Sequence, residues 1–440
     1  MKFNFSCLYL VISSFIVFHA CSPAAKITAS AGEAFVIGDA LPDAPALAPR
    51  GDFTVGVRTL EVNHKDQVNI LKSKAGVDSL YDRNLVMEVW YPAIVPEGIK
   101  QLVTYDEVMG SFNDPKRPLI PFQFTGRALR NASALAVPGG YPLVIVSHGY
   151  LGSRFLLTYL TENLASKGYV VVAIDHKEST FRDAAGFEST LLNRAKDILF
   201  VLNQMDALSK AGSINFLSGL VDANNTALIG YSMGGYGVLN ASGAGYSEQL
   251  LKFFGTIARG SKAIEERITN NETFKSSYDQ RIKAVVAFAP WGMQRGVWDA
   301  EGLQGLKVPI FFVAGNLDDI SGYEKGIKAM YTGAVNSDRY LLTYDNARHN
   351  VAPNPPPPQS LKPGLPFDEY YRYAEPSWNE RRINNINQHF VTAFLGIYLK
   401  QQDNGKYLSL KENANQGAWT GFKPRSATGL SLLHANAADR

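Results

Sequence analysis

A serine flanked by glycines stands between an expected strand and an expected helix. The residues are 230–234 (GYSMG), with an apolar run before them and few bulky side chains after them. Glycines two positions before and after the serine permit a tight strand-to-helix turn, in which Cβ atoms would collide. Such a turn exposes the Ser232 hydroxyl in front of the amides of the new helix. We therefore expect Ser232 to be a nucleophile.

A serine hydroxyl is a weak nucleophile at neutral pH, so it needs a base, and the base needs an orienting acid. In doubly wound hydrolases the order along the chain is serine, acid, histidine. Three histidines follow Ser232: His389 lies in an expected amphipathic helix, and His434 lies in a polar tail. His349 instead follows the last expected strand, at the sheet edge where catalytic groups gather. We predict that His349 is the base.

Two adjacent aspartates are candidates for the acid. Asp318 and Asp319 follow the apolar run 309–314 after a glycine, an asparagine and a leucine. A carboxylate just past a buried strand lies at the same sheet edge as His349 and can accept the imidazole N–H. Asp318 fits best, three residues after the glycine that ends the strand. Asp319 remains the alternative, since it could cap a helix over 320–330.

An ester or amide hydrolase also needs two N–H groups for the oxyanion of its intermediate. The N–H of Met233, next to the nucleophile, is the first. The second is expected from the glycine-containing loop 147–153, where Tyr150 is the best donor. His148 is expected to brace this loop; the alternatives are a second base or a metal ligand, but no partner stands at ligand spacing.

The elements that must position these residues alternate along the chain. Central strands are expected over 142–147, 169–174, 227–229, 284–289 and 309–314, with an early strand over 84–91 and a last one over 339–344. Helices are expected over 155–165, 190–208 and 379–399. Short buried strands separated by helices predict an α/β fold with a doubly wound, mostly parallel sheet and helices on both faces.

Composition divides the chain into parts. Residues 1–21 are the expected export signal, 22–50 a flexible tether rich in Ala, Pro, Gly and Ser, 51–402 the catalytic domain and 403–440 a C-terminal tail. Within the catalytic domain, 242–280 is an insertion with amphipathic stretches. It could form a lid over the site or simply fill the surface. The apolar stripe of the helix over 379–399 is expected to pack in the core.

The first residues have the pattern of an export signal. Lys2 precedes an apolar stretch over 8–18, and small residues surround Cys21. The stretch is too short to span a bilayer. Cys21 stands where a bacterial lipoprotein carries its lipid, so we predict lipidation and an envelope location (outer membrane or periplasm), with the lipid anchor as the only membrane contact. The alternative is cleavage after Ala31 and secretion.

Overall composition excludes several classes. With 46% apolar and 11% aromatic residues in 440, the chain is globular rather than disordered. The formal charge of +3 is small, and no basic cluster suggests a nucleic-acid partner. Both cysteines, Cys7 and Cys21, lie in or beside the export segment, so the folded part has no disulfide and no cysteine-based metal site. No metal or organic cofactor is implied.

Several segments resemble one family. The matching segments are 88–92 (EVWYP), 146–149 (VSHG), 230–235 (GYSMGG), 315–318 (GNLD) and His349. They are similar to α/β-hydrolases of the dienelactone-hydrolase-like group, which includes bacterial relatives of platelet-activating-factor acetylhydrolase. The resemblance implies Ser232, Asp318 and His349 as nucleophile, acid and base, with the amides of Tyr150 and Met233 as oxyanion hole. True dienelactone hydrolases use a cysteine nucleophile.

Polyester hydrolases of the cutinase type are similar too. They share an aromatic residue at Tyr150, the Ser-Met-Gly-Gly turn and a segment like 168–175 (GYVVVAID). Many of them carry C-terminal disulfide cysteines that this chain lacks.

These observations predict a serine esterase that acts on a small-molecule, lipid or polymer ester through an acyl-enzyme. The alternatives are a polyester or phospholipid acetyl-ester specificity, a serine peptidase on the same fold, and an inactive binding module.

Overall fold

The computed structural model describes Met1 and residues 35–437. The predicted lipidation site Cys21 and nearly all of the predicted export signal lie outside the described residues. Within the described part, residues 36–437 belong to one compact unit. No helix of the described part has the length and apolar character needed to cross a membrane.

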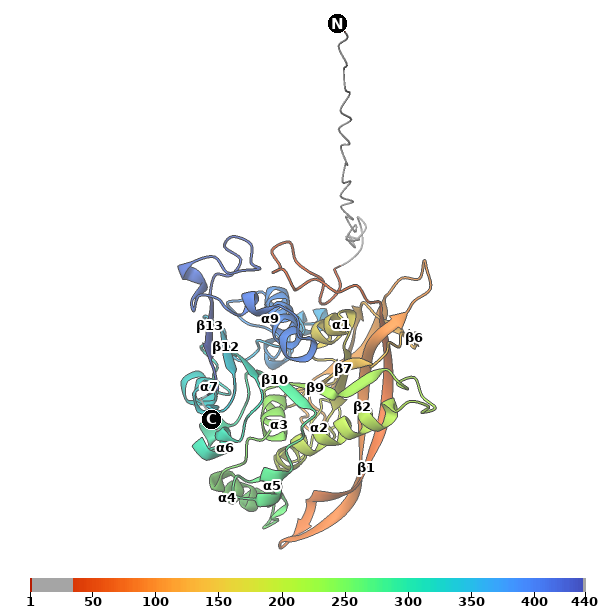
Figure 1. The fold of residues 1–440 in the computed structure, drawn as a ribbon. Coiled ribbons are helices and arrows are strands. Elements are labelled where there is room, and N and C mark those ends of the chain that lie inside the picture. The colour runs from red at the N-terminus through yellow and green to blue at the C-terminus, as the bar shows by residue number, and fades with distance from the viewer. Residues whose placement is uncertain (2–34, 438–440) are drawn as a thin grey trace. The chain divides into compact units, whose positions relative to one another are not determined.

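The central strands run parallel in the spatial order β8, β7, β9, β10, β11, β12 (Figure 1). Their bounds are β7 Tyr141–Ser147, β8 Val170–Asp175, β9 Val221–Tyr231, β10 Ile282–Phe288, β11 Ile310–Gly315 and β12 Arg339–Tyr344. Antiparallel strands flank them: β2 (Val77–Ile94) pairs with β8, and β1 (Val55–Lys74) pairs with β2. The strands expected from the sequence and the α/β class are confirmed.

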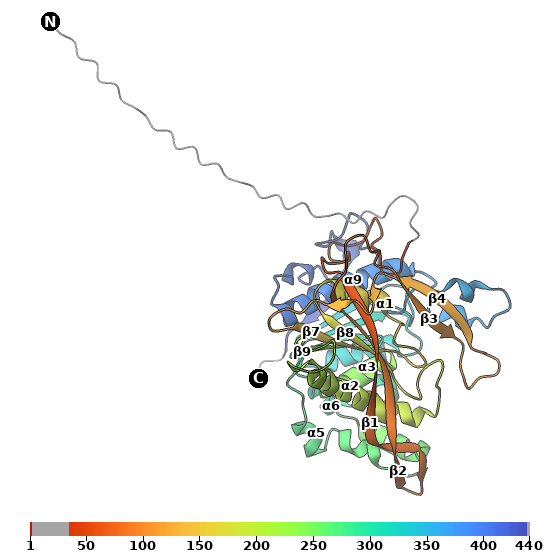
Figure 2. The same cartoon turned by 90° about the vertical axis from the view of Figure 1, so that its right-hand side faces the viewer.

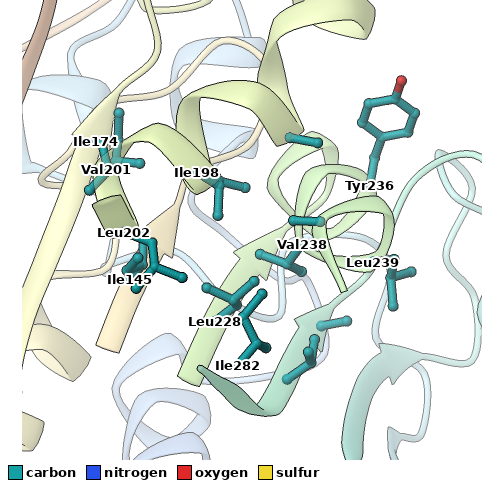
Figure 3. Packing of buried hydrophobic residues seen from close by; sticks show 14 of the residues in the cluster. Ile145, Ile174, Ile198, Val201, Leu202, Leu228, Tyr236, Val238, Leu239 and Ile282 are labelled. Carbon is teal, nitrogen blue, oxygen red and sulfur yellow. The ribbon is translucent and has the colours of Figure 1, made fainter. Parts of the chain in front are cut away.

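Helices cover both faces of this sheet (Figure 1). They are α1 Thr158–Ser166 and α9 Glu380–Lys400 on one face, and α2 Phe187–Ser209 and α3 Met233–Ala241 on the other. Neighbouring residues of β7 point to opposite faces, so Ile145 packs with α2 and α3 whereas Val144 packs with α1 and α9. Figure 3 shows the first cluster, where Ile198 and Val238 lie over the strand residue Leu228. Full burial on both faces explains the continuous apolar strands.

The long β1–β2 hairpin extends this sheet beyond β8 (Figure 2). A separate two-stranded sheet pairs β3 (Val103–Met109) with β4 (Ile120–Gly126). Two short strands, β5 (Leu129–Arg130) and β6 (Ser133–Ala134), pair with β1 and β2, respectively.

The insertion over 242–280 forms α4 (Glu248–Ile257), the 3-10 turn η1 (Ala263–Arg267) and α5 (Glu272–Ser276). The tip of the β1–β2 hairpin holds its middle: Gly76 N donates to Arg259 O at 3.1 Å, and Ser261 Oγ donates to Asp78 Oδ2 at 3.0 Å. These hydrogen bonds anchor the middle of the insertion and favour the surface-filling alternative over a mobile lid.

The predicted tether over 22–50 is wrong for its second half. Residues 36–50 lie against α1 and α9, where Leu41 N donates to Asn385 Oδ1 at 2.8 Å and Leu47 N donates to His389 Nδ1 at 3.1 Å. Polar side chains of α9 replace the backbone partners that an irregular segment lacks. Composition alone could not reveal this, because the partners lie more than 340 residues away.

Residues 339–344 form the predicted strand β12, but the prediction that it is the last strand is wrong. β13 (Leu430–Ala435), inside the predicted tail over 403–440, pairs antiparallel with β12 along its whole length. Leu430 and Leu432 are buried against the sheet, while the residues between and after them are half-buried or exposed. The alternating pattern was too short to stand out among its polar neighbours. His434 lies in this strand, with its ring stacked on Tyr340 at 4.2 Å.

The remaining short elements connect these parts. They are η2 Met293–Arg295, α6 Ala300–Gln304, η3 Tyr323–Ile327, α7 Lys328–Gly333, η4 Pro358–Leu361, α8 Asp368–Tyr371, η5 Gly405–Tyr407 and η6 Ala414–Gln416.

Candidate active site

Ser232 lies at a strained turn between β9 and α3. Its φ of 53° falls in the left-handed region, which is costly for a residue with a Cβ. The turn is so tight that a Cβ on Gly230 would lie 2.2 Å from Gly234 O, and one on Gly234 would lie 1.9 Å from Ser147 O. Glycine is therefore required at both positions, and the hydroxyl is presented above the carboxyl end of the sheet.

His349 and Asp318 meet Ser232 at this edge. Nε2 of His349 lies 3.0 Å from the Ser232 Oγ. Nδ1 of His349 lies 2.9 Å from Asp318 Oδ2 and 3.1 Å from Asp318 Oδ1. With the Nδ1 proton donated to Asp318, Nε2 is left as an acceptor for the serine hydroxyl. The side chains come from three loops at the ends of β9, β11 and β12.

The two aspartates have different surroundings. Asp318 is buried, and its Oδ1 accepts the N–H groups of Ile320 and Ser321 at 2.9 and 2.8 Å. Asp319 instead pairs with the guanidinium of Arg348, which is 44% exposed. The structure thus places Asp318, and not its neighbour, against the imidazole.

The loop after β7 approaches the nucleophile. A Cβ on Gly149 would lie 3.4 Å from the Cβ of Ser232, so the backbone before Tyr150 runs beside the serine. Met233 is the first residue of α3, and N–H groups of a first turn have no acceptor inside the helix. The two amides predicted as the oxyanion hole therefore belong to segments that flank Ser232.

His148 braces this loop, as expected from the sequence. Its Nε2 accepts the N–H of His176 at 3.2 Å, and its Nδ1 lies 2.6 Å from Gly149 O. Burial, and then the nearby Arg194, lowers the pKa of His148 well below its usual value. Among the described residues, no group of three or more His, Cys, Asp or Glu side chains could hold a metal ion.

A second serine–histidine–aspartate set lies inside the body, and no sequence pattern predicted it. Ser147 Oγ lies 2.8 Å from His176 Nε2, and His176 Nδ1 lies 2.9 Å from Asp197 Oδ2. Arg83 binds Asp197 through Nε at 2.8 Å and Nη2 at 3.0 Å. We call Ser147, His176 and Asp197 the buried set, and Ser232, His349 and Asp318 the elbow set.

The buried set is closed to solvent, and the pKa values of its histidine and aspartate are strongly shifted. Its serine and aspartate are 0% exposed and its histidine 1%, against 6–7% for the elbow set. Burial, and next the Arg194 charge, lowers the pKa of His176 to about 3. Burial alone would raise the pKa of Asp197, but the Arg83 charge and the hydrogen bonds from His176 and Arg83 lower it.

Aromatic rings form a row beside Ser232. Tyr150 meets Phe187 edge to face at 5.5 Å, and Phe187 meets Trp291 edge to face at 5.4 Å. The backbone N–H of Trp291 donates to Ser232 O at 3.1 Å, so the residue at one end of the row lies next to the nucleophile. Two other aromatic residues, Trp298 and Phe254, are buried in the core. The sequence analysis did not predict Phe187 in the site. Trp291 could have been found, because it follows β10 directly and so lies at the carboxyl edge of the sheet.

Comparisons with known proteins agree with this architecture. Residues 134–251 match the family model described as "PETase: PET hydrolase-like". Cutinase est1 of Thermobifida alba is 26% identical over 215 residues, which cover 49% of this chain and 55% of that protein. Cutinase 1 of Thermobifida cellulosilytica is 25% identical over 247 residues, covering 54% and 74% of the two chains. The chain thus spans about half the length of the first of these relatives.

A solved structure extends the likeness to nearly the whole chain. The ferulic acid esterase from Streptomyces cinnamoneus superposes with a TM-score of 0.54 at 19% identity, covering 89% of this chain and 99% of that one. At this identity the likeness concerns the fold. The chain is an α/β-hydrolase in fold, and its sequence similarity is to cutinases and PET hydrolase-like proteins.

Proposed function

We propose that the protein is a serine hydrolase of carboxylic esters. The observation that carries the proposal is the continuous hydrogen-bonded chain from the Ser232 hydroxyl through His349 to Asp318. It stands at a strained turn beside two segments whose amides can bind an oxyanion. The cutinase and esterase likenesses support the same reaction class.

In the proposed reaction, Nε2 of His349 takes the hydroxyl proton as Oγ of Ser232 attacks the ester carbonyl carbon. The N–H groups of Tyr150 and Met233 bind the oxyanion of the tetrahedral intermediate. His349 then gives its proton to the leaving alcohol, and an acyl-enzyme forms on Ser232. Water, deprotonated by His349, releases the carboxylic acid. Asp318 keeps the proton on Nδ1 and stabilises the imidazolium.

The surroundings of Ser232 favour an apolar or aromatic ester. The row Tyr150, Phe187 and Trp291 offers ring faces and edges to an acyl or alcohol group. Leu317 and Ile320, on the loop that carries Asp318, are 56% and 45% exposed. A polyester of the kind that cutinases and PET hydrolase-like proteins are named for is the preferred substrate. A phospholipid acetyl ester, in line with the acetylhydrolase resemblance, is the alternative.

We also propose that the enzyme is exported and anchored by a lipid on Cys21. The support is the apolar segment over 8–18 and the lone cysteine after it. Metabolic labelling with a palmitate analogue, compared between wild type and Cys21→Ala, tests the anchor. Loss of label in the variant is expected, and equal labelling of both would contradict it.

Covalent labelling with a fluorophosphonate tests the reaction class. We expect one adduct, on Ser232, together with hydrolysis of short-chain nitrophenyl esters and of a polyester film. Parallel assays with a peptide and a phospholipid acetyl ester separate the alternatives. Absence of an adduct on folded protein would contradict the proposal.

A further inference from the structure

The segment between His349 and α9 is long and irregular, yet it returns to the base at its end. It runs over 351–378 and closes in a turn where Glu375 and Trp378 form an isolated antiparallel bridge. His349 itself stands in a loop, outside the strand pairings of the sheet. Its position therefore depends on what holds that loop.

The Glu375 carboxylate holds the two peptide groups on either side of the base. Oε2 accepts the N–H of Arg348 at 2.7 Å, and Oε1 accepts the N–H of Asn350 at 2.5 Å. Glu375 is 3% exposed, so these bonds are shielded from water. Hydrogen bonds to an ionised carboxylate are shorter and stronger than neutral ones. Burial raises the pKa of Glu375, and the two amide bonds oppose that rise.

The same turn also holds the start of the loop. Nε1 of Trp378 donates to Asp345 O at 2.7 Å, directly after β12. The indole packs edge to face on Tyr344 at 4.9 Å. Further along, the side-chain Nδ2 of Asn350 donates to the carbonyl oxygens of Tyr371 and Ala374. Hydrogen bonds from this segment thus hold the loop on both sides of His349.

We propose that Glu375 is a positioning residue for the base, and that Trp378 assists it. By fixing both peptides next to His349, Glu375 sets the distance of Nε2 from the Ser232 hydroxyl. The inference rests on the proposed function, since it assigns a role within that reaction. A displacement of the His349 imidazole by about 1 Å would lower the rate about a hundredfold.

The test is Glu375→Gln, which keeps the size of the side chain but turns one acceptor into a donor facing an N–H. We expect kcat on a nitrophenyl ester to fall about tenfold to a hundredfold with KM nearly unchanged. Fluorophosphonate labelling of Ser232 should slow by the same factor. Trp378→Phe, which keeps one aromatic ring but loses the pyrrole ring and its N–H, should have a smaller effect in the same direction.

Matched controls separate positioning from stability. Glu369→Gln changes another buried glutamate of the same segment, one that accepts Gly110 N at 2.8 Å and does not touch the base loop. Trp419→Phe removes a buried indole N–H for which the described residues supply no acceptor. Both controls should keep kcat and the labelling rate, whatever they do to the melting temperature.

Three results would overturn the inference: equal kcat losses in Glu375→Gln and Glu369→Gln, a loss confined to KM, or an unchanged labelling rate. If Glu375→Gln fails to fold, the pair Trp378→Phe and Trp419→Phe decides, and equal kcat in these two overturns it. A wild-type protein that is not labelled at Ser232 would instead refute the proposed function.

Discussion

The elbow set and the buried set have almost the same hydrogen-bond geometry and opposite surroundings. The serine-to-histidine distances are 3.0 and 2.8 Å, and the histidine-to-aspartate distances are 2.9 Å in both. Only the elbow serine has a left-handed φ, helix amides in front of it and an aromatic row beside it. The buried serine ends a strand in the closed interior.

Under the proposed function, the difference means that hydrogen bonds among a serine, a histidine and an aspartate are not enough to make the serine a nucleophile. A general base works when its pKa lies near the working pH, whereas burial holds the pKa of His176 at about 3. Arg83 also occupies both oxygens of Asp197, so this carboxylate is a structural partner. The buried set ties β7, β8 and α2 together behind the loop that carries Tyr150, and so supports the elbow set.

Replacing each serine in turn should give the largest contrast. Ser232→Ala should lower kcat/KM for a nitrophenyl ester at least about ten-thousandfold, because the attacking atom is removed. Ser147→Ala should stay within about tenfold and cost about 1–2 kcal/mol of stability, because His176 loses one partner. Ester hydrolysis and urea unfolding measure the two effects. A Ser147→Ala variant as inactive as Ser232→Ala, while still folded, would erase the contrast.

Gly234 lies where the elbow set and the buried set come close together, since a Cβ added to it would lie 1.9 Å from the carbonyl oxygen of Ser147. Gly234→Ala should push α3 away from β7, with loss of most activity and several kcal/mol of stability, on the order of overpacking a core. Gly255→Ala is the matched control, because a Cβ there meets no atom within 4 Å. It should leave activity unchanged and stabilise α4 by about 0.5–1 kcal/mol. Thermal melting and ester assays measure both; an active Gly234→Ala protein would contradict the geometry.

The pH dependence of the free energy of unfolding should reflect the shifted pKa of His176. Because burial lowers the pKa of His176 from 6.5 to about 3, its neutral form stabilises the fold above pH 6.5. That contribution is lost as the pH falls from 6.5 towards 3, since the unfolded chain binds the proton more readily. Gln at this position has no titratable group, so His176→Gln removes the titration and keeps a neutral polar side chain.

His176→Gln should therefore be less stable than wild type at pH 8, by about 1–3 kcal/mol, and the gap should narrow below pH 6.5. Asp197, Arg83 and Arg194 are the charged groups that act on this ring. Urea midpoints of both proteins at pH 8, 6 and 4.5 give the measurement. A gap that stays constant over this range would show that His176 does not titrate as described.

The smallest effect concerns the aromatic row, which only the elbow set has. Tyr150→Ala should lower kcat/KM for an aromatic acyl ester about threefold to tenfold, and for an acetate ester less, because one ring contact is lost. Tyr150→Phe should match wild type, since the phenol contacts Ala185 O only at 3.4 Å. Equal losses on both esters would show that the ring does not select the substrate.

The sequence predicted the fold because its signals are local. Apolar runs of strand length alternate with segments of helical periodicity, and the glycines around Ser232 indicate a tight turn. The predicted positions of His349 and Asp318 followed from one rule, that parallel strands deliver their carboxyl ends to one sheet edge. The failures were long-range: residues 36–50 depend on α9, and β13 depends on β12.

What the sequence by itself determined is the order of strands and helices and the residues at the strand ends, because periodicity and turn chemistry act over a few neighbours. Only the tertiary structure decided that Asp318 rather than Asp319 faces the imidazole, that Ser147 and His176 pair in the interior, and that Glu375 holds the base loop. These contacts join residues 25 or more positions apart, and their geometry is set by packing that no local pattern encodes.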